Sequence, residues 1–225
     1  LEDGFENIPP NRGLISQVGR KLENEALYEA AQKLYEEAQN LNLGYGFQLE
    51  LAGLYGVQGE TKKMVDAYLL LVVENPAYKN SVQSALLRYL DFIEDQELSE
   101  LLRTSLLEAV QRHSENKNLA EVLIWYYYQT GQYAAAFTQV RALDLRYKED
   151  GRRVLEYAQL AARNDAFTAA YMAYDYLEQQ YPGTGMLPQV LMQKAKMAYH
   201  RREVLTVRNN IYFRIFLTEP IFILF

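Results

Sequence analysis

The chain of 225 residues contains no cysteine, and this absence removes several kinds of chemistry at once. Disulfides, thiolate nucleophiles and zinc sites built on sulfur are excluded. Histidine is nearly absent too, since only His113 and His200 occur, far apart and without the acidic neighbours that a metal site or proton relay needs. Neither a glycine-rich phosphate loop nor a nucleophile elbow is present. We therefore expect no catalytic residues, no cofactor and no metal.

Positive charge is also in short supply. The formal net charge is −6, and no long basic run offers a field that would attract a phosphate backbone. Nucleic acid is therefore not an expected partner. Apolar runs are too short for a transmembrane helix. The chain begins at Leu1 with no signal-peptide pattern, and the missing cysteines lead us to favour an exported location, periplasmic or cell-envelope, over the cytoplasm.

The long middle of the chain has a helical pattern. Apolar residues recur at steps of three and four, as in Leu119, Val122, Leu123 and Tyr126. Glycine and proline gather instead in short breaks at regular intervals. This arrangement predicts helices of roughly 12 to 16 residues joined by short turns, with no strand before the last fifteen residues.

The helical pattern repeats. The clearest copy has apolar positions before and after a turn at Gly131: Ala120, Leu123, Ile124 and Tyr127, then Ala136 and Val140. The same pattern returns 34 residues later around Tyr157, Ala170 and Tyr174. Upstream, the step from Leu22 to Tyr55 is 33 residues and the step from Tyr55 to Tyr127 is 72, which leaves room for one degenerate copy with helices at 80–93 and 96–113. The first helix of one more, partial copy is predicted at 187–200.

This pattern resembles the tetratricopeptide repeat family over residues 11–200. The resemblance implies an all-α fold, a right-handed superhelix (α-solenoid) of about five helix-turn-helix units plus a partial sixth. Residues 1–10 would be an N-terminal extension, and residues 201–225 a basic and then apolar C-terminal segment. The buried aromatic spacers would be Tyr35, Tyr55, Tyr68, Tyr127 and Tyr174. We expect turn carbonyls to accept hydrogen bonds from their hydroxyls.

In this family the first helices line a concave groove that holds an extended peptide or a partner helix, so the resemblance implies a protein or peptide partner. The residues beside the buried positions of those helices are the expected groove residues: Arg20, Asn24, Tyr89, Phe92, Trp125, Tyr128, Gln129, Arg152, Gln159, Arg163, Gln193 and Lys196. Aromatic and basic side chains suit a ligand with apolar anchors and carboxylates. In the alternative interpretation, the aromatic run 125–128 belongs mostly to the core and the basic residues are solvated.

Residues 211–225 are aromatic, β-branched and strongly apolar, unlike everything before them. Three interpretations remain open: a cap packed on the last helices, a membrane-surface or partner-docking peptide, or an artificial end of a longer protein. Packing on a neighbouring molecule, and hence self-association, is a further hypothesis. The function predicted for the whole chain is a protein-interaction scaffold. The alternative is a structural, assembly or spacer domain of a larger protein, without a dedicated peptide site.

Overall fold

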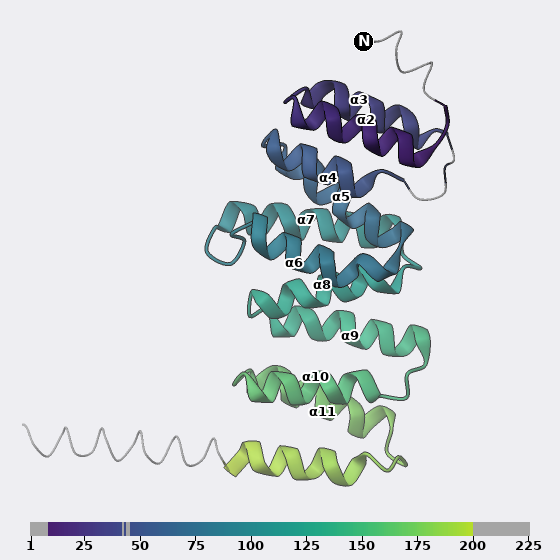
Figure 1. Cartoon of the computed structure of the whole chain (residues 1–225). Helices are drawn as coiled ribbons and strands as arrows, with labels where there is room; N and C mark the ends of the chain where they lie inside the picture. Colours follow the sequence, from purple (N-terminus) through teal and green to yellow (C-terminus); the bar gives the residue numbers. More distant parts are fainter. Residues whose placement is uncertain (1–8, 42, 44–45, 200–225) are drawn as a thin grey trace, which may run out of the picture. The chain divides into compact units, whose positions relative to one another are not determined.

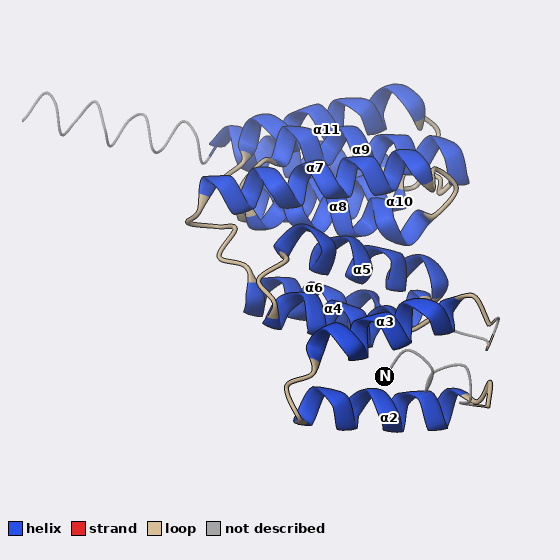
Figure 2. Cartoon of the chain, turned by 90° about the horizontal axis from the view of Figure 1, so that it is seen from above, coloured by secondary structure: helices blue, strands red, loops and turns tan. Residues whose placement is uncertain are grey.

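The computed structural model describes residues 9–41, 43 and 46–199. His200 and the apolar segment 211–225 lie outside the described residues. Within them every regular element is a helix, as Figure 2 shows, which confirms the predicted all-α helical repeat fold. The chain divides into two compact units, Leu1–Gln132 (unit 1) and Tyr133–Phe225 (unit 2), and the boundary falls inside the clearest copy of the repeat, directly after its turn at Gly131.

Unit 1 is a series of helices in sequence order (Figure 1). Its described elements are α2 (Arg12–Asn24), α3 (Tyr28–Gln39), α4 (Gln48–Val57), α5 (Thr61–Glu74), the short 3₁₀ helix η1 (Pro76–Tyr78), α6 (Lys79–Tyr89), α7 (Gln96–Arg112) and α8 (Lys117–Gln129). Helix α2 packs on α3 and α4 on α5, while α7 packs on both α5 and α8. Two helix hairpins, α2–α3 and α4–α5, therefore begin this unit as the sequence pattern predicted, whereas α6 contacts α5 and α8.

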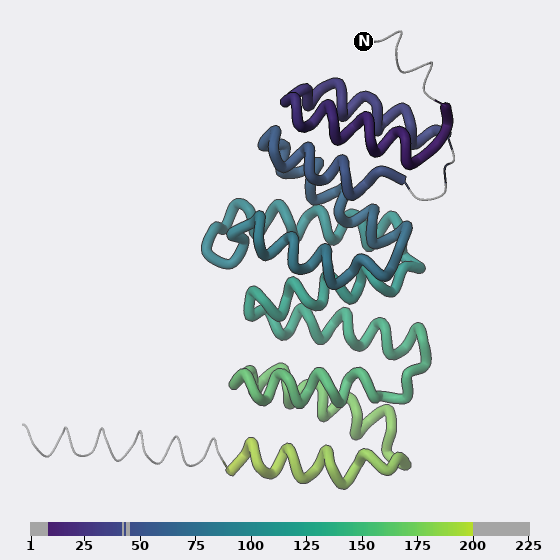
Figure 3. Tube along the Cα trace, viewed as in Figure 1, coloured from purple at the N-terminus to yellow at the C-terminus, as the bar shows by residue number. Residues whose placement is uncertain are grey.

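Unit 2 continues the same plan. It contains α9 (Tyr133–Tyr147), α10 (Arg152–Arg163), α11 (Phe167–Gln180) and a helical stretch at 187–199, whose path the tube in Figure 3 makes easy to follow. Helix α10 packs against both α9 and α11. The Phe137 ring joins these layers, because it stacks on Tyr157 at 5.6 Å and meets Tyr176 edge-on at 6.2 Å.

The first helices of four repeats end in the same turn. The second residue after each helix has a left-handed backbone, and the next amide donates to the carbonyl five residues earlier, which closes the helix end. The left-handed residues are Ala26 (φ 57°), Gly59 (φ 74°), Gly131 (φ 67°) and Asp165 (φ 57°). The closing bonds are Leu27 to Leu22, Glu60 to Tyr55 and Gln132 to Tyr127, each 2.8 Å, and Ala166 to Ala161 at 2.9 Å. The repeat spacing predicted from apolar residues is thus present in the turns.

Helix α6 differs from its prediction. It was expected to reach Ile93, but it ends at Tyr89, and Leu90 is extended with φ −124° and ψ 122°. The early end allows Phe92, only 1% exposed, to pack beside Trp125 and Tyr126 at ring distances of 5.8 and 5.7 Å. The expectation that Phe92 faces a groove is therefore wrong. The gain from burying an aromatic ring outweighs the few helical bonds that the chain gives up.

The five tyrosines predicted as core spacers are all buried. Their hydroxyl partners are not the expected turn carbonyls in two cases, because Tyr35 donates to the Glu23 carboxylate at 2.8 Å and Tyr55 to Glu36 at 2.9 Å. Such bonds to a charged acceptor are stronger than bonds to a carbonyl. Elsewhere in unit 2, Tyr157 donates to the Tyr133 carbonyl at 2.7 Å.

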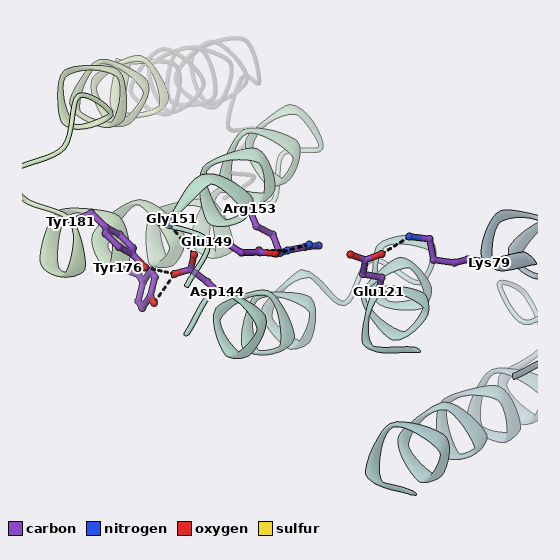
Figure 4. Close-up of polar contacts among 8 residues, drawn as sticks. All are labelled: Lys79, Glu121, Asp144, Glu149, Gly151, Arg153, Tyr176 and Tyr181. Atoms are coloured by element: carbon purple, nitrogen blue, oxygen red, sulfur yellow. Dashed lines mark hydrogen bonds and ion pairs between the residues drawn. The ribbon is translucent and has the colours of Figure 1, made fainter. Parts of the chain in front are cut away.

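A fully buried carboxylate, that of Asp144, binds three segments of unit 2 together. It accepts hydrogen bonds from the Gly151 amide at 2.9 Å, the Tyr176 hydroxyl at 3.0 Å and the Tyr181 hydroxyl at 2.6 Å. Figure 4 shows both phenols pointing toward this carboxylate. Burial, followed by the bond to Asp144, raises the pKa of Tyr181 well above its usual value. The cluster joins α9, the turn before α10 and the end of α11.

Candidate partner-binding site

A cavity of about 540 Å³ in unit 2 gathers four of the predicted groove residues. Gln159 and Arg163 come from α10, and Gln193 and Lys196 come from the helical stretch 187–199. Residues three or four positions apart share one face of a helix, so each helix presents an amide and a cation to the same space. The cavity therefore lies between two predicted first helices.

The wall of this cavity also contains Tyr174 of α11, which is fully buried. Among the five tyrosines predicted as core spacers, Tyr174 alone has a hydroxyl oxygen that is buried without a hydrogen-bond partner in the described part of the chain. Leaving such a group unpaired costs about 1–3 kcal/mol. Burial raises the pKa of Tyr174, while the nearby Arg163 charge acts in the opposite direction. The phenol is therefore a neutral donor at physiological pH.

Positive charge and hydrogen-bond donors dominate the cavity. Arg163 and Lys196 form no ion pair with any residue that the structure describes, and Asp165 is the single carboxylate in the wall. Arginine offers a planar fork of donors and lysine three more, while each glutamine adds an amide. The group that such a cavity can hold best is an anionic acceptor, above all a carboxylate.

The remaining predicted groove residues do not line this cavity. Arg20 and Asn24 are exposed on α2, Tyr89 is 58% exposed at the end of α6, and Arg152 is exposed at the start of α10. On α8, Trp125 and Tyr128 are half-buried and Gln129 is exposed. The half-buried Trp125 beside Phe92 fits the alternative interpretation, in which part of the aromatic run belongs to the core.

A second cavity, of about 320 Å³, lies in unit 1 and was missed by the sequence analysis. Its wall comes from α3, α4, α5 and α7. Three of these, α3, α5 and α7, are the second helices of their repeats. No sequence signal could have found it, because its residues are scattered between Glu36 and His113 and share no motif. The family resemblance had predicted binding residues on the first helices only.

The described residues hold no group of three or more histidine, cysteine, aspartate or glutamate side chains placed to bind a metal ion. Among the same residues, none of the helices combines the length and the apolar character needed to cross a membrane.

No protein-family model and no curated protein sequence matches this chain. Solved structures that resemble it include the following two. One, described as a functional characterization of Pseudomonas aeruginosa PilF, is 18% identical, with 92% of this chain and 93% of that chain covered and a TM-score of 0.34. The other, YrrB, is described as a TPR protein with an unusual peptide-binding site and is 16% identical, with 79% and 88% covered and a TM-score of 0.34. Likenesses this remote do not identify a partner, and the fold class rests on the chain's own helices.

Proposed function

We propose that this chain is a protein-interaction scaffold that binds a carboxylate-bearing segment of a partner protein in the unit 2 cavity. The observation that carries the proposal is the convergence on one space of Arg163, Lys196 and the Tyr174 hydroxyl, which has no hydrogen-bond partner among the described residues. A bound carboxylate would accept hydrogen bonds from all three donors. Charge-assisted bonds of this kind contribute about 1.5–3 kcal/mol each.

The amides support the same interpretation. Gln159 and Gln193 can donate to a peptide carbonyl and accept from a peptide N–H, which an extended segment presents along its whole length. The two cations would then fix the acidic side chain or terminal carboxylate. Catalysis is not part of the proposal, because these groups bind and orient an anion without supplying a nucleophile.

The test is a selection from a library of random peptides displayed on phage, with the whole chain as bait. We expect enrichment of peptides that carry glutamate, aspartate or a free C-terminal carboxylate. In fluorescence anisotropy, an enriched peptide should bind at least tenfold more weakly when its acidic residue is replaced by the amide. It should lose a similar factor to the double variant Arg163→Gln/Lys196→Gln. Raising the salt concentration should weaken binding as well.

The matched control removes the same charge elsewhere in unit 2. Arg141 and Lys148 are exposed and do not line the cavity, so Arg141→Gln/Lys148→Gln should bind the peptide with unchanged affinity. Equal losses in the two double variants would mean that net charge alone attracts the peptide, which contradicts the proposal. Failure of the wild-type chain to enrich any peptide would favour the spacer hypothesis.

A further inference from the structure

The unit 1 cavity has an apolar floor. Ala67, Leu70 and Val73 lie along α5, and Leu51 of α4 and Ala109 of α7 complete the apolar surface. Two of these residues are alanines, and their short side chains leave the volume that larger residues would fill. A cavity of this size is at the lower end of the range for ligand sites, which matches one large side chain.

Ser105 of α7 and Gln48 of α4 are the buried polar residues in the wall of this cavity, and the Gln48 amide donates to Glu74. Ser105 is 1% exposed, and its Oγ has no hydrogen-bond partner among the residues that the structure describes. A serine inside a helix usually bonds the carbonyl one turn earlier, and this one does not. A buried hydroxyl without a partner is costly, and a bound polar group would remove that cost.

Most of the charged side chains in the wall, namely Glu36, Lys63, Asp66 and Glu108, are engaged by neighbouring residues. The Lys62 ammonium lies 2.7 Å from Asp66 and 3.2 Å from Glu108, and Lys63 pairs with Glu60 at 2.7 Å. Glu36 accepts the Tyr55 hydroxyl. The wall therefore favours neither a cation nor an anion. The exception is Arg112, which forms no ion pair within the described residues and whose planar guanidinium can stack on an aromatic ring.

From these features we infer that the unit 1 cavity is a second binding site, which takes one tyrosine or tryptophan side chain of a partner protein. The ring lies on the apolar floor, and the polar tip of the side chain forms a hydrogen bond with Ser105. Tyrosine and tryptophan combine a large apolar body with one polar group, and they are the common anchors of protein interfaces. The inference is independent of the carboxylate site in unit 2.

The test uses small molecules that reproduce the anchor: 4-methylphenol and 3-methylindole, with toluene as the probe that lacks a polar group. Binding to the whole chain is followed by methyl NMR with labelled alanine, leucine and valine. We expect saturable shifts at Ala67, Leu70, Val73 and Ala109. The affinity for 4-methylphenol should be about fivefold higher than that for toluene, as one neutral hydrogen bond allows. Ser105→Ala should abolish that difference.

Two variants keep the result interpretable. Ala109→Leu fills the cavity, so it should remove binding of all three probes while the thermal midpoint stays within a few degrees of wild type. Arg163→Gln alters the unit 2 cavity alone and should change none of the probe affinities, which separates the two proposals. The inference is overturned if 4-methylphenol and toluene bind equally well, if Ser105→Ala leaves their difference intact, or if the methyl signals of Ala67, Leu70, Val73 and Ala109 do not shift.

Discussion

At the scale of single residues, Asp144 is the side chain whose replacement should cost unit 2 most. Its carboxylate accepts one amide and two phenols in a fully buried position. In Asp144→Asn one acceptor oxygen becomes an amide donor, which then faces either the Gly151 N–H or the two phenol hydroxyls. We expect the free energy of unfolding to fall by about 2–4 kcal/mol, measured by urea titration with circular dichroism.

The control for this substitution is a neighbouring aspartate. Asp150 is exposed and has φ 54°, a left-handed conformation that asparagine tolerates equally well. Asp150→Asn should therefore change the free energy of unfolding by less than about 0.5 kcal/mol. Comparable losses in the two variants would show that the buried network contributes little.

Tyr55 gives a prediction for alkaline pH. Burial, and then the hydrogen bond to Glu36, raises the pKa of Tyr55 to about 12, from about 10 in an unfolded chain. Between these values the unfolded state loses the proton while the folded state keeps it, so stability falls as pH rises. The loss from this residue is at most about 2–3 kcal/mol.

The measurement is a series of urea titrations between pH 8 and pH 11. Tyr55→Phe should be less stable than wild type at pH 8, because the bond to Glu36 is lost, and the gap between the two should narrow as pH rises. A gap that stays constant across the series would contradict the assigned role of Tyr55.

At the scale of helices and turns, the four matching helix ends differ in how well their residues suit them. A left-handed backbone costs an ordinary L-residue roughly 1–2 kcal/mol, and glycine avoids that cost. Ala26 (φ 57°) bears this strain where Gly59 (φ 74°) does not. We expect Ala26→Gly to stabilise unit 1 by about 0.5–1 kcal/mol and Gly59→Ala to destabilise it by about 1 kcal/mol or more.

Urea midpoints of the two variants decide this prediction, since both turns lie in unit 1 and unfold from the same background. Opposite shifts are expected. Shifts in the same direction would mean that the turns are not equivalent, whatever their dihedral angles.

The helices were predictable from sequence because their signals are local and repeated. Gly59 and Gly131 indicate a helix end by residue type, whereas Ala26 and Asp165 do not, and the repeat period located those turns instead. The end of α6 was mispredicted because Leu90, Phe92 and Ile93 continue an apolar pattern that a helix could also have used. Whether Phe92 packs beside Trp125 depends on residues more than 30 positions away, which no local pattern contains.

The two cavities also differ in how far the sequence could predict them. The repeat register placed Gln159, Arg163, Gln193 and Lys196 on corresponding faces of successive first helices, so their convergence followed from the period. That the Tyr174 and Ser105 hydroxyls have no partner within residues 9–41, 43 and 46–199 could not be predicted, because an unsatisfied hydroxyl is defined by every atom around it. Sequence therefore indicates where donors gather, and the structure adds how each of them is surrounded.

At the scale of the whole molecule, stability should be local. In stacked repeats each element contacts its neighbours alone, so the effect of a substitution decays along the chain. Asp144→Asn should speed amide hydrogen exchange in α10 and α11 while leaving α4 and α5 as protected as before. Mass spectrometry after peptic digestion measures both regions in one experiment. Equal loss of protection in the two units would show a single cooperative structure.

Trp125, the one tryptophan of the chain, lies in unit 1 with its indole against the Phe92 ring. Excitation near 295 nm selects tryptophan, so the emission spectrum reports the unfolding of unit 1 and not that of α9, α10 and α11. Far-ultraviolet circular dichroism, in contrast, reports the helix content of both units. Both signals can be recorded during one denaturation. A difference between the two unfolding curves then measures unfolding of unit 2 that is separate from that of unit 1.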